Sequence, residues 1–204
     1  MINNAGIAIG SPLEVIPLHQ LRKQLDVNVI GQIAVTQAFL PLLRRARGRI
    51  VNMGSIAGRG TIPMTGPYSA SKHALEALTD ALRMELKPWG ILVSIIEPGA
   101  IATPIWDKSL KTAADVEADV PEGGKHLYGE AACRVREAVE HIAQRAIPVD
   151  AVVQAVLHAL TAPRPKTRYL VGTDAKIRAV MVKWLPDRVQ DWILMTWLKL
   201  PPRA

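Results

Sequence analysis

Apolar side chains recur at helical spacing near the start of the chain. They occupy every fourth position from Leu21 to Ile33, and further apolar residues follow at 39, 40 and 43. A repeat of this period places the residues on one face of a helix. The pattern predicts a helix over about 18–47. We expect irregularities at Gly31 and Pro41, because proline lacks the N–H group that a helix interior needs.

Shorter apolar runs predict β-strands. The run 91–96 is almost continuously apolar, which is typical of a strand buried on both faces of a sheet. Further strands are expected at 49–53 and 168–172, with the end of another at 1–5, and helical sequence at 67–86 and 149–160 separates them. Strands and helices that alternate in this way form right-handed crossovers and a parallel sheet. The predicted fold class is therefore α/β.

One long segment interrupts this alternation. Residues 104–147 have an acidic middle around Asp115, Glu117 and Asp119, followed by a charged helix near 130–145. A connection of this length between core elements suggests a substrate lid or a binding region.

The tail, residues 175–204, has a different character. It holds three of the five tryptophans, Trp184, Trp192 and Trp197, among aliphatic and basic residues. Two interpretations stay open for this tail. Its helices pack against the domain or a sister subunit, or they lie as amphipathic helices on a membrane surface.

Composition bounds the class of protein. The chain has 204 residues, of which 49% are hydrophobic and 21% charged, so we expect a globular protein with a real core. The net charge is +7, but the basic residues are scattered. Their tightest cluster, Arg44 to Arg49, closes a predicted helix, where cations are favoured by the helix dipole. We therefore expect no nucleic-acid partner.

Cysteine and histidine use points to an intracellular protein without a metal. The single Cys133 excludes an intrachain disulfide and fits a reducing compartment. The five histidines are dispersed, so we predict no metal site. We find no signal peptide and no apolar run of about 18 residues. The expected location is the cytoplasm, with peripheral membrane contact through the tail as the alternative.

The candidate chemistry centres on Tyr68 and Lys72. The two residues are four apart on the predicted helix 67–86 and so share one face of it. The pKa of a free phenol is about 10, and a fixed ammonium beside it favours the phenolate and lowers that pKa. Ser55 follows the strand 49–53, at the strand end where open α/β sheets place their ligands. Its hydroxyl could therefore meet the same substrate oxygen as the phenol.

Three further motifs agree with this set. The chain opens on Asn3-Asn4-Ala5-Gly6, Asn28 lies in Asp-Val-Asn-Val-Ile-Gly, and Pro98-Gly99-Ala-Ile-Ala-Thr103 follows another strand. Together with Ser55 and the Tyr68–Lys72 pair, they make the chain resemble the short-chain dehydrogenase/reductase family from Asn3 to about Gly172. The resemblance implies a partial Rossmann-like, doubly wound parallel sheet of about four strands with helices on both faces. The implied strand order is Ala5, Ile50, Leu92, Leu170.

The resemblance also implies an activity and its residues. The reaction is hydride transfer between NAD or NADP and a small-molecule secondary alcohol or ketone. Tyr68 is then the acid/base, Ser55 orients the substrate oxygen, Lys72 lowers the Tyr68 pKa and binds the nicotinamide ribose, and Asn28 completes a proton relay through a water molecule. Two further sets of implied cofactor contacts are Asn4, Ala5 and Gly6 beside the adenosine ribose, and Pro98, Gly99, Ile101 and Thr103 over the carboxamide.

The same resemblance divides the chain and gives weak hints about substrate and assembly. Residues 1–174 correspond to the C-terminal part of a Rossmann-type domain, with 104–147 as the lid, and 175–204 form a helical tail. The Arg-Tyr-Leu-Val-Gly strand and the Trp-rich tail are similar to the hydroxysteroid, retinol and 3-hydroxybutyrate dehydrogenase branch, which favours a hydrophobic substrate. We also expect a homo-oligomer.

Two alternatives compete with this interpretation. Ser69-Ala-Ser-Lys72 satisfies the Ser-x-x-Lys motif of acyl enzymes, but its companion Ser-Asp-Asn and Lys-Thr-Gly motifs do not occur. The second alternative is a non-catalytic binding or scaffold subunit, because the sequence contains no Gly-x-Gly-x-x-Gly turn for a pyrophosphate. The chain begins where the family has an interior strand, so we expect a truncated reading frame. Alone, such a chain should bind NAD(P) weakly and self-associate through its exposed sheet edge.

Overall fold

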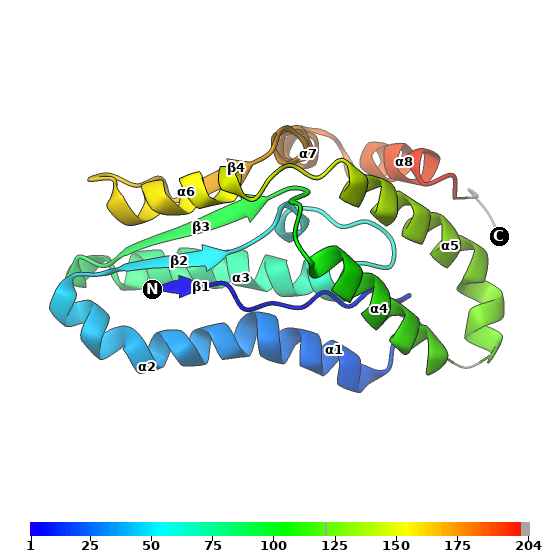
Figure 1. Ribbon diagram of the computed structural model, residues 1–204, viewed down its shortest axis with the longest axis horizontal. Helices are drawn as coiled ribbons and strands as arrows, with labels where there is room; N and C mark the ends of the chain where they lie inside the picture. The colour runs from blue at the N-terminus through cyan, green and yellow to red at the C-terminus, as the bar shows by residue number, and fades with distance from the viewer. Residues whose placement is uncertain (121, 201–204) are drawn as a thin grey trace.

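The computed structural model describes residues 1–120 and 122–200 and contains a parallel sheet with helices on both faces (Figure 1). The elements follow one another in the order β1 (Ile2–Asn3), α1 (Leu18–Leu25), α2 (Gly31–Ala46), β2 (Arg49–Met53), α3 (Gly66–Glu85), β3 (Leu92–Pro98), α4 (Ile105–Ala118), α5 (Glu122–Gln144), α6 (Asp150–Thr161), β4 (Arg168–Val171), α7 (Thr173–Trp184) and α8 (Asp187–Trp197).

The sheet has the strand order expected from the sequence. Its four strands lie in the order β1-β2-β3-β4, and every neighbouring pair is parallel. Val51 of β2 lies opposite Ile2 of β1 and Ser94 of β3, which fixes the register across the first three strands. Parallel strands all end at the same edge of the sheet, so the loops that follow β1, β2 and β3 meet there.

Helices cover the two faces of the sheet with separate apolar cores. On one face, Val51 and Ile96 of the central strands pack with Val152 and Ala159 of α6. On the other face, a second cluster joins β2 and β3 to α2 and α3, and it includes Ile50, Val93, Leu43 and Leu82. Neighbouring strand residues thus point to opposite layers, which explains why most positions of β2 and β3 are apolar.

The first helical stretch differs in detail from the simple apolar pattern. A π-helical turn at Asp26–Ile30 joins α1 to α2, close to the irregularity expected at Gly31. The most buried positions form a polar stripe of Gln24, Asn28, Gln32 and Thr36. The stretch Leu18–Ala46 is long and apolar enough to cross a membrane by length and composition alone. In this fold its polar stripe binds loops and strands of the domain instead.

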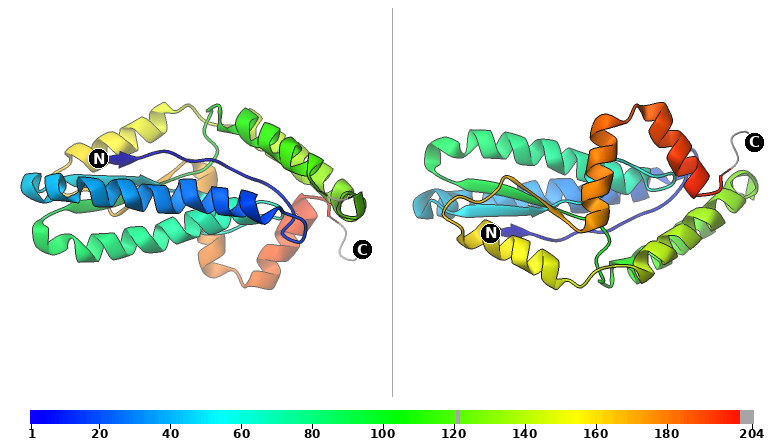
Figure 2. Two further views of the ribbon diagram at one scale, coloured as in Figure 1. Left: turned by 90° about the horizontal axis from the view of Figure 1, so that it is seen from below. Right: turned by 90° about the horizontal axis from the view of Figure 1, so that it is seen from above.

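The remaining helices extend beyond the carboxyl ends of the strands. Helices α4 and α5 fill most of the segment 104–147, lie side by side, and reach out on one side of the domain (Figures 1 and 2). The tail forms α7 and α8, which lie on the other side at the same end (Figure 2). The space between these two helical pairs lies above the strand ends, where the sequence predicts the site.

Candidate active site

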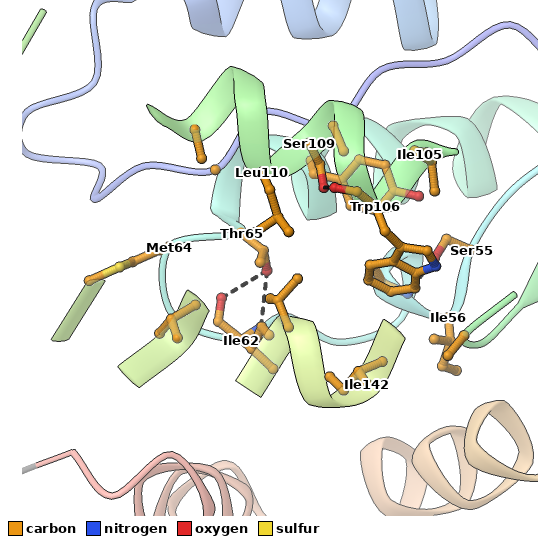
Figure 3. A pocket seen from close by; sticks show the side chains of 18 of the residues that line it. Ser55, Ile56, Ile62, Met64, Thr65, Ile105, Trp106, Ser109, Leu110 and Ile142 are labelled. Atoms are coloured by element: carbon orange, nitrogen blue, oxygen red, sulfur yellow. Dashed lines mark hydrogen bonds between the residues drawn. The ribbon is translucent and has the colours of Figure 1, made fainter. Parts of the chain in front are cut away.

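A large cavity opens at the carboxyl edge of the sheet. Its volume is about 1160 Å³, and most of its lining residues are apolar. The walls come from the loops after β1, β2 and β3 and from α4, α5, α7 and α8. Figure 3 shows part of it, with Trp106 of α4 lying between Ser55 and Ile142 of α5. A cavity of this size and apolar character suits an organic ligand.

Helix α3 presents Tyr68 and Lys72 to this cavity. The helix begins at Gly66 with Pro67 in its first turn, where the missing N–H of proline costs no hydrogen bond. Lys72 is buried, and its Nζ donates to the carbonyl of Met53 at 2.7 Å. Burial lowers the pKa of Lys72 to about 8, although the nearby Glu76 carboxylate acts in the opposite direction. The helix is therefore anchored to the end of β2 through the Lys72 side chain.

Ser55 lies on the loop that leaves β2. Its hydroxyl caps the short 3-10 helix at Ile56–Gly58 by accepting the N–H of Ala57 at 3.1 Å. Burial raises the pKa of the Tyr68 phenol, and a hydrogen bond with Ser55 opposes that change. The net direction is upward, whereas the sequence suggested that Lys72 would lower this pKa. The reason is that burial of the phenol outweighs the other effects in the protein alone.

A close approach of main chain to helix holds this loop in place. A Cβ at Gly58 would lie 3.0 Å from the Lys72 carbonyl oxygen and 3.2 Å from Glu76 Cγ. Any larger residue would push the loop away from α3. Glycine at position 58 therefore keeps Ser55 and Tyr68 on one wall of the cavity.

Asn28 is completely buried in the π-helical turn, and its side chain binds the loop after β1. Its Oδ1 accepts the N–H of Ile7 at 2.9 Å, and its Nδ2 donates to the Ile7 carbonyl and to Ser71 Oγ. At Gly6, a Cβ would lie 3.5 Å from Asn28 Oδ1 and 3.8 Å from Lys72 Nζ. Asn28 and Lys72 thus approach the same backbone position. The predicted proton relay through Asn28 stays a prediction.

The loop after β3 is fixed at several of its backbone groups. The carboxylate of Asp174 accepts the N–H of Ala100 at 2.7 Å, and the indole of Trp106 donates to the Ile101 carbonyl at 2.7 Å. Ile147 exchanges backbone hydrogen bonds with Ala100 and Ala102. The predicted carboxamide-binding residues therefore lie on a loop held from α4, α7 and the segment before α6.

Most of the predicted site residues lie on the cavity wall. The lining includes Asn4, Gly6, Ser55, Tyr68, Lys72, Pro98, Gly99, Ile101 and Thr103. Ala5 and Asn28 are not part of the lining, and the Ala5 carbonyl instead accepts a hydrogen bond from Gln32. Ser69, the serine of the alternative Ser-x-x-Lys motif, is buried and also lies off the cavity wall.

A charged cluster lies beside this wall. Glu97 of β3 is fully buried and binds the guanidinium of Arg59, with Nε at 2.5 Å from Oε2. Arg168 of β4 contacts Glu76, Asp80 and Glu97. Burial and the Glu97 charge raise the pKa of Glu76 to about 7, against the effect of Arg168. The cluster links β3, β4, α3 and the loop that carries Ser55.

Three residues of this site escaped the sequence analysis: Trp106, Asp174 and Arg178, which all line the cavity. The contacts of Asp174 and Arg178 join segments far apart in the chain, so no local sequence spacing predicts them. The one signal in the sequence is the position of Asp174, directly after the predicted strand 168–172. A polar residue there points to the edge where the other strands end.

The fold and the site together define a Rossmann-type α/β domain with a tyrosine, a lysine and a serine at the carboxyl edge of its sheet. A model of the family described as short chain dehydrogenase matches residues 1–114, which is more than half of the chain. The chain therefore belongs to the short-chain dehydrogenase/reductase family.

Individual proteins support this assignment. The chain is 38% identical over 204 residues to an NADPH-dependent 3-dehydrocapnine reductase of Ornithobacterium rhinotracheale, covering 98% of this chain and 70% of that protein. It is 40% identical to retinol dehydrogenase 5 of Mus musculus, covering 97% of this chain and 64% of that protein. The chain thus spans about two thirds of the length of these relatives. A short chain dehydrogenase from Burkholderia cenocepacia, solved in complex with NADP, superposes with a TM-score of 0.68 at 27% identity, over 95% of this chain and 69% of that one.

Proposed function

We propose that this protein is an NAD(P)-dependent oxidoreductase that interconverts a secondary alcohol and a ketone. One observation carries the proposal: Ser55, Tyr68 and Lys72 come from separate segments and lie on the wall of a single large apolar cavity. Membership of the short-chain dehydrogenase family supports the same reaction. A non-catalytic scaffold would have no need for a phenol and an ammonium placed together in such a cavity.

In this proposal the proton transfer is carried out by Tyr68, with help from Ser55 and Lys72. The Tyr68 hydroxyl donates a proton to the carbonyl oxygen of a ketone, or removes one from the hydroxyl of an alcohol. Ser55 binds the same oxygen and opposes the burial that raises the pKa of the phenol. The Lys72 ammonium, fixed by the Met53 carbonyl, lies over the Tyr68 ring at 5.8 Å from its centroid. Its charge stabilises the phenolate that forms when the proton leaves.

The residues on the wall fit the nicotinamide end of NAD or NADP. Because Gly6 has no side chain, nothing at position 6 covers Lys72 Nζ, and the ammonium can reach a ribose hydroxyl. The loop 98–103 is held in place by its backbone hydrogen bonds and would contact the carboxamide. The nicotinamide ring would supply or accept the hydride. Asn28 would complete the proton relay behind Lys72, and Asn4, Ala5 and Gly6 would lie beside the adenosine ribose.

The walls formed by α4 and α5 favour a hydrophobic substrate. Ile105, Leu110, Val135 and Ile142 of these helices line the cavity. Relatives named as a retinol dehydrogenase and a 17-beta-hydroxysteroid dehydrogenase agree with an apolar substrate. We propose that the segment 104–147 is a lid over this substrate, as its length suggests.

The test is turnover by the purified protein, expressed with any in-frame sequence that its gene has upstream of Met1. It is assayed with NADH and with NADPH on a panel of hydrophobic ketones, followed by nicotinamide absorbance. We expect turnover that falls when Ser55 is changed to Ala, because the substrate oxygen loses a partner. The control is Ser109→Ala, since Ser109 also lines the cavity but donates its hydrogen bond to the Trp106 carbonyl. Equal losses in the two variants, or no turnover with either cofactor, would contradict the proposal.

The exposed apolar residues of the tail favour contact with a membrane surface. Trp184 and Trp192 are 71% and 68% exposed, and Lys176 and Arg188 lie nearby in the sequence. We propose weak, salt-sensitive binding to anionic lipids. Co-sedimentation with anionic vesicles at low and high salt measures it, and absence of binding at low salt would refute it.

A second surface favours self-association. Ile30, Phe39 and Leu42 are about half exposed or more along the first helical stretch. We propose that these side chains are covered in a homo-oligomer. Sedimentation velocity tests this, because the Phe39→Lys variant should sediment as a smaller species than the unaltered protein.

A further inference from the structure

The cavity lining contains one partly buried arginine, and its charge has no acidic partner among the described residues. Arg178 of α7 lines the cavity and is partly buried. Its Nη2 donates to the Thr61 carbonyl at 3.0 Å, and no carboxylate of residues 1–120 and 122–200 lies within 4.0 Å of its guanidinium. Burial lowers the pKa of Arg178. A guanidinium in this position loses hydration and is not compensated by a charge.

Two other cations of the cavity lining are paired with carboxylates, and Arg145 is exposed to solvent. Arg136 binds Glu117 at 2.6 Å, and Lys125 lies 3.6 Å from Glu122. Asp174 precedes Arg178 by one turn of α7. Its carboxylate accepts the backbone N–H of Ala100 and forms no ion pair with the Arg178 guanidinium. Lys72 donates one hydrogen bond to the Met53 carbonyl and is assigned, in the proposed reaction, to the phenolate of Tyr68 and the cofactor ribose. Arg178 is therefore the partly buried arginine of this wall that is available to bind a ligand.

The position of Arg178 relates it to the proposed reaction. A Cβ at Gly60 would lie 3.2 Å from Arg178 Nη2 and 3.4 Å from its Nε, so the guanidinium lies directly over Gly60. Gly60 belongs to the loop that connects Ser55 to Tyr68. The charge is thus held against the loop between Ser55 and Tyr68, beside the two residues of the proposed reaction. Ile177 and Met181, its neighbours on α7, are apolar parts of the same lining.

We propose that Arg178 binds an oxyanion group of the substrate, such as a carboxylate, sulfonate or phosphate. The substrate would then be an amphiphile, with an apolar body along α4 and α5 and an anionic group at α7. A guanidinium offers its donors in a planar fork that matches two oxygens of one oxyanion, and such charge-assisted bonds are strong where water is excluded. This inference rests on the proposed function for the identity of the cavity as a substrate site.

Binding of two matched probes tests the assignment without turnover. Calorimetric titration with decanesulfonate and with decanol, both below their micelle concentrations, compares an anionic and a neutral ligand with the same chain. We expect the unaltered protein to bind the sulfonate more tightly. Arg178→Met should weaken sulfonate binding by about tenfold to a hundredfold and change decanol binding by less than about twofold. Arg178→Lys should retain part of the preference, because the charge remains.

Arg145→Met is the matched control, since Arg145 also lines the cavity but is exposed. This variant should keep the preference for sulfonate. The assignment is wrong if Arg145→Met has the same effect as Arg178→Met, because the preference would then reflect the general positive field. It is also wrong if Arg178→Met weakens both probes equally, if it instead weakens binding of NADPH, or if the unaltered protein does not prefer the sulfonate.

A last variant separates this inference from the proposed function. Tyr68→Phe should keep the preference for sulfonate while losing turnover. If the protein has no oxidoreductase activity but its preference for sulfonate still depends on Arg178, the anion site stands and the proposed reaction is wrong.

Discussion

The carboxylate of Asp174 accepts the backbone N–H of Ala100 at 2.7 Å and so joins the first turn of α7 to the loop after β3. The two residues are 74 positions apart in the chain. Glycine at position 99 makes the contact possible, because a Cβ there would overlap the Asp174 carboxylate. Helix α7, which leads into the tail, is therefore joined to the site through this hydrogen bond.

We predict that Asp174→Ala lowers the free energy of unfolding by about 1–2 kcal/mol, because a charge-assisted hydrogen bond is lost and the Ala100 N–H is left without its acceptor. Urea unfolding measures the change. Asp187→Ala is the control, since Asp187 lies in the first turn of α8 and loses only its interaction with the helix dipole, about 0.5 kcal/mol. Equal losses in the two variants would show that the contact with Ala100 adds nothing.

Arg168 is predicted to stabilise the buried charged cluster. It lies 2.5 Å from Asp80 and 3.2 Å from Glu97 and also contacts Glu76. Arg168→Met should lower the free energy of unfolding by about 3 kcal/mol, because buried carboxylates lose their main partner. Arg83→Met removes an exposed partner of Asp80 and should cost less than about 1 kcal/mol. Thermal unfolding of the two variants decides the matter, and a stable Arg168 variant would contradict the account of the cluster.

Glu76 should make stability depend on pH. Burial and the Glu97 charge raise its pKa from 4.5 to about 7 in the folded protein. In this range the folded state holds a proton that the unfolded state releases. The contribution of Glu76 to stability is therefore fully present below pH 4.5 and is lost as the pH rises through about 7.

A Glu76→Gln variant cannot ionise at this position. The unaltered protein should therefore lose stability relative to this variant between about pH 5 and about pH 7.5. Urea unfolding at both pH values measures the difference. Glu85→Gln, an exposed change on the same helix, should track the unaltered protein. A constant difference between the Glu76 variant and the unaltered protein would mean that the pKa of Glu76 is not raised.

Much of the fold follows from local sequence. The apolar runs correctly predict where the strands lie, because a strand buried on both faces is rich in apolar residues, and the family resemblance correctly implies their order. The start of α3 was also predictable, since Gly66 and Pro67 mark it. Ser55, Tyr68 and Lys72, which the motif spacing suggested would lie together, line the same cavity.

Other features depend on contacts that no local pattern encodes. Helix α4 was not predicted, because its acidic sequence resembles a loop, yet its Val116 packs against Ile9 and Ile16. The polar stripe of the first helical stretch is buried because Gln24 and Asn28 bind the backbone of the loop 7–9. The tail contributes to the cavity through α7 and α8, whose lining residues are far in the chain from the strands that carry the other walls.

The most direct test of the account is the turnover number of Tyr68→Phe with a hydrophobic ketone and NAD(P)H, compared with that of Tyr128→Phe. Tyr128 also lines the cavity, but it is only partly buried and its hydroxyl binds Glu14. We predict that Tyr68→Phe lowers kcat by about a hundredfold to ten-thousandfold, because the proton donor is removed, while Tyr128→Phe leaves it nearly unchanged. A Tyr68→Phe variant that keeps most of its activity would contradict the assignment of Tyr68 as the acid/base.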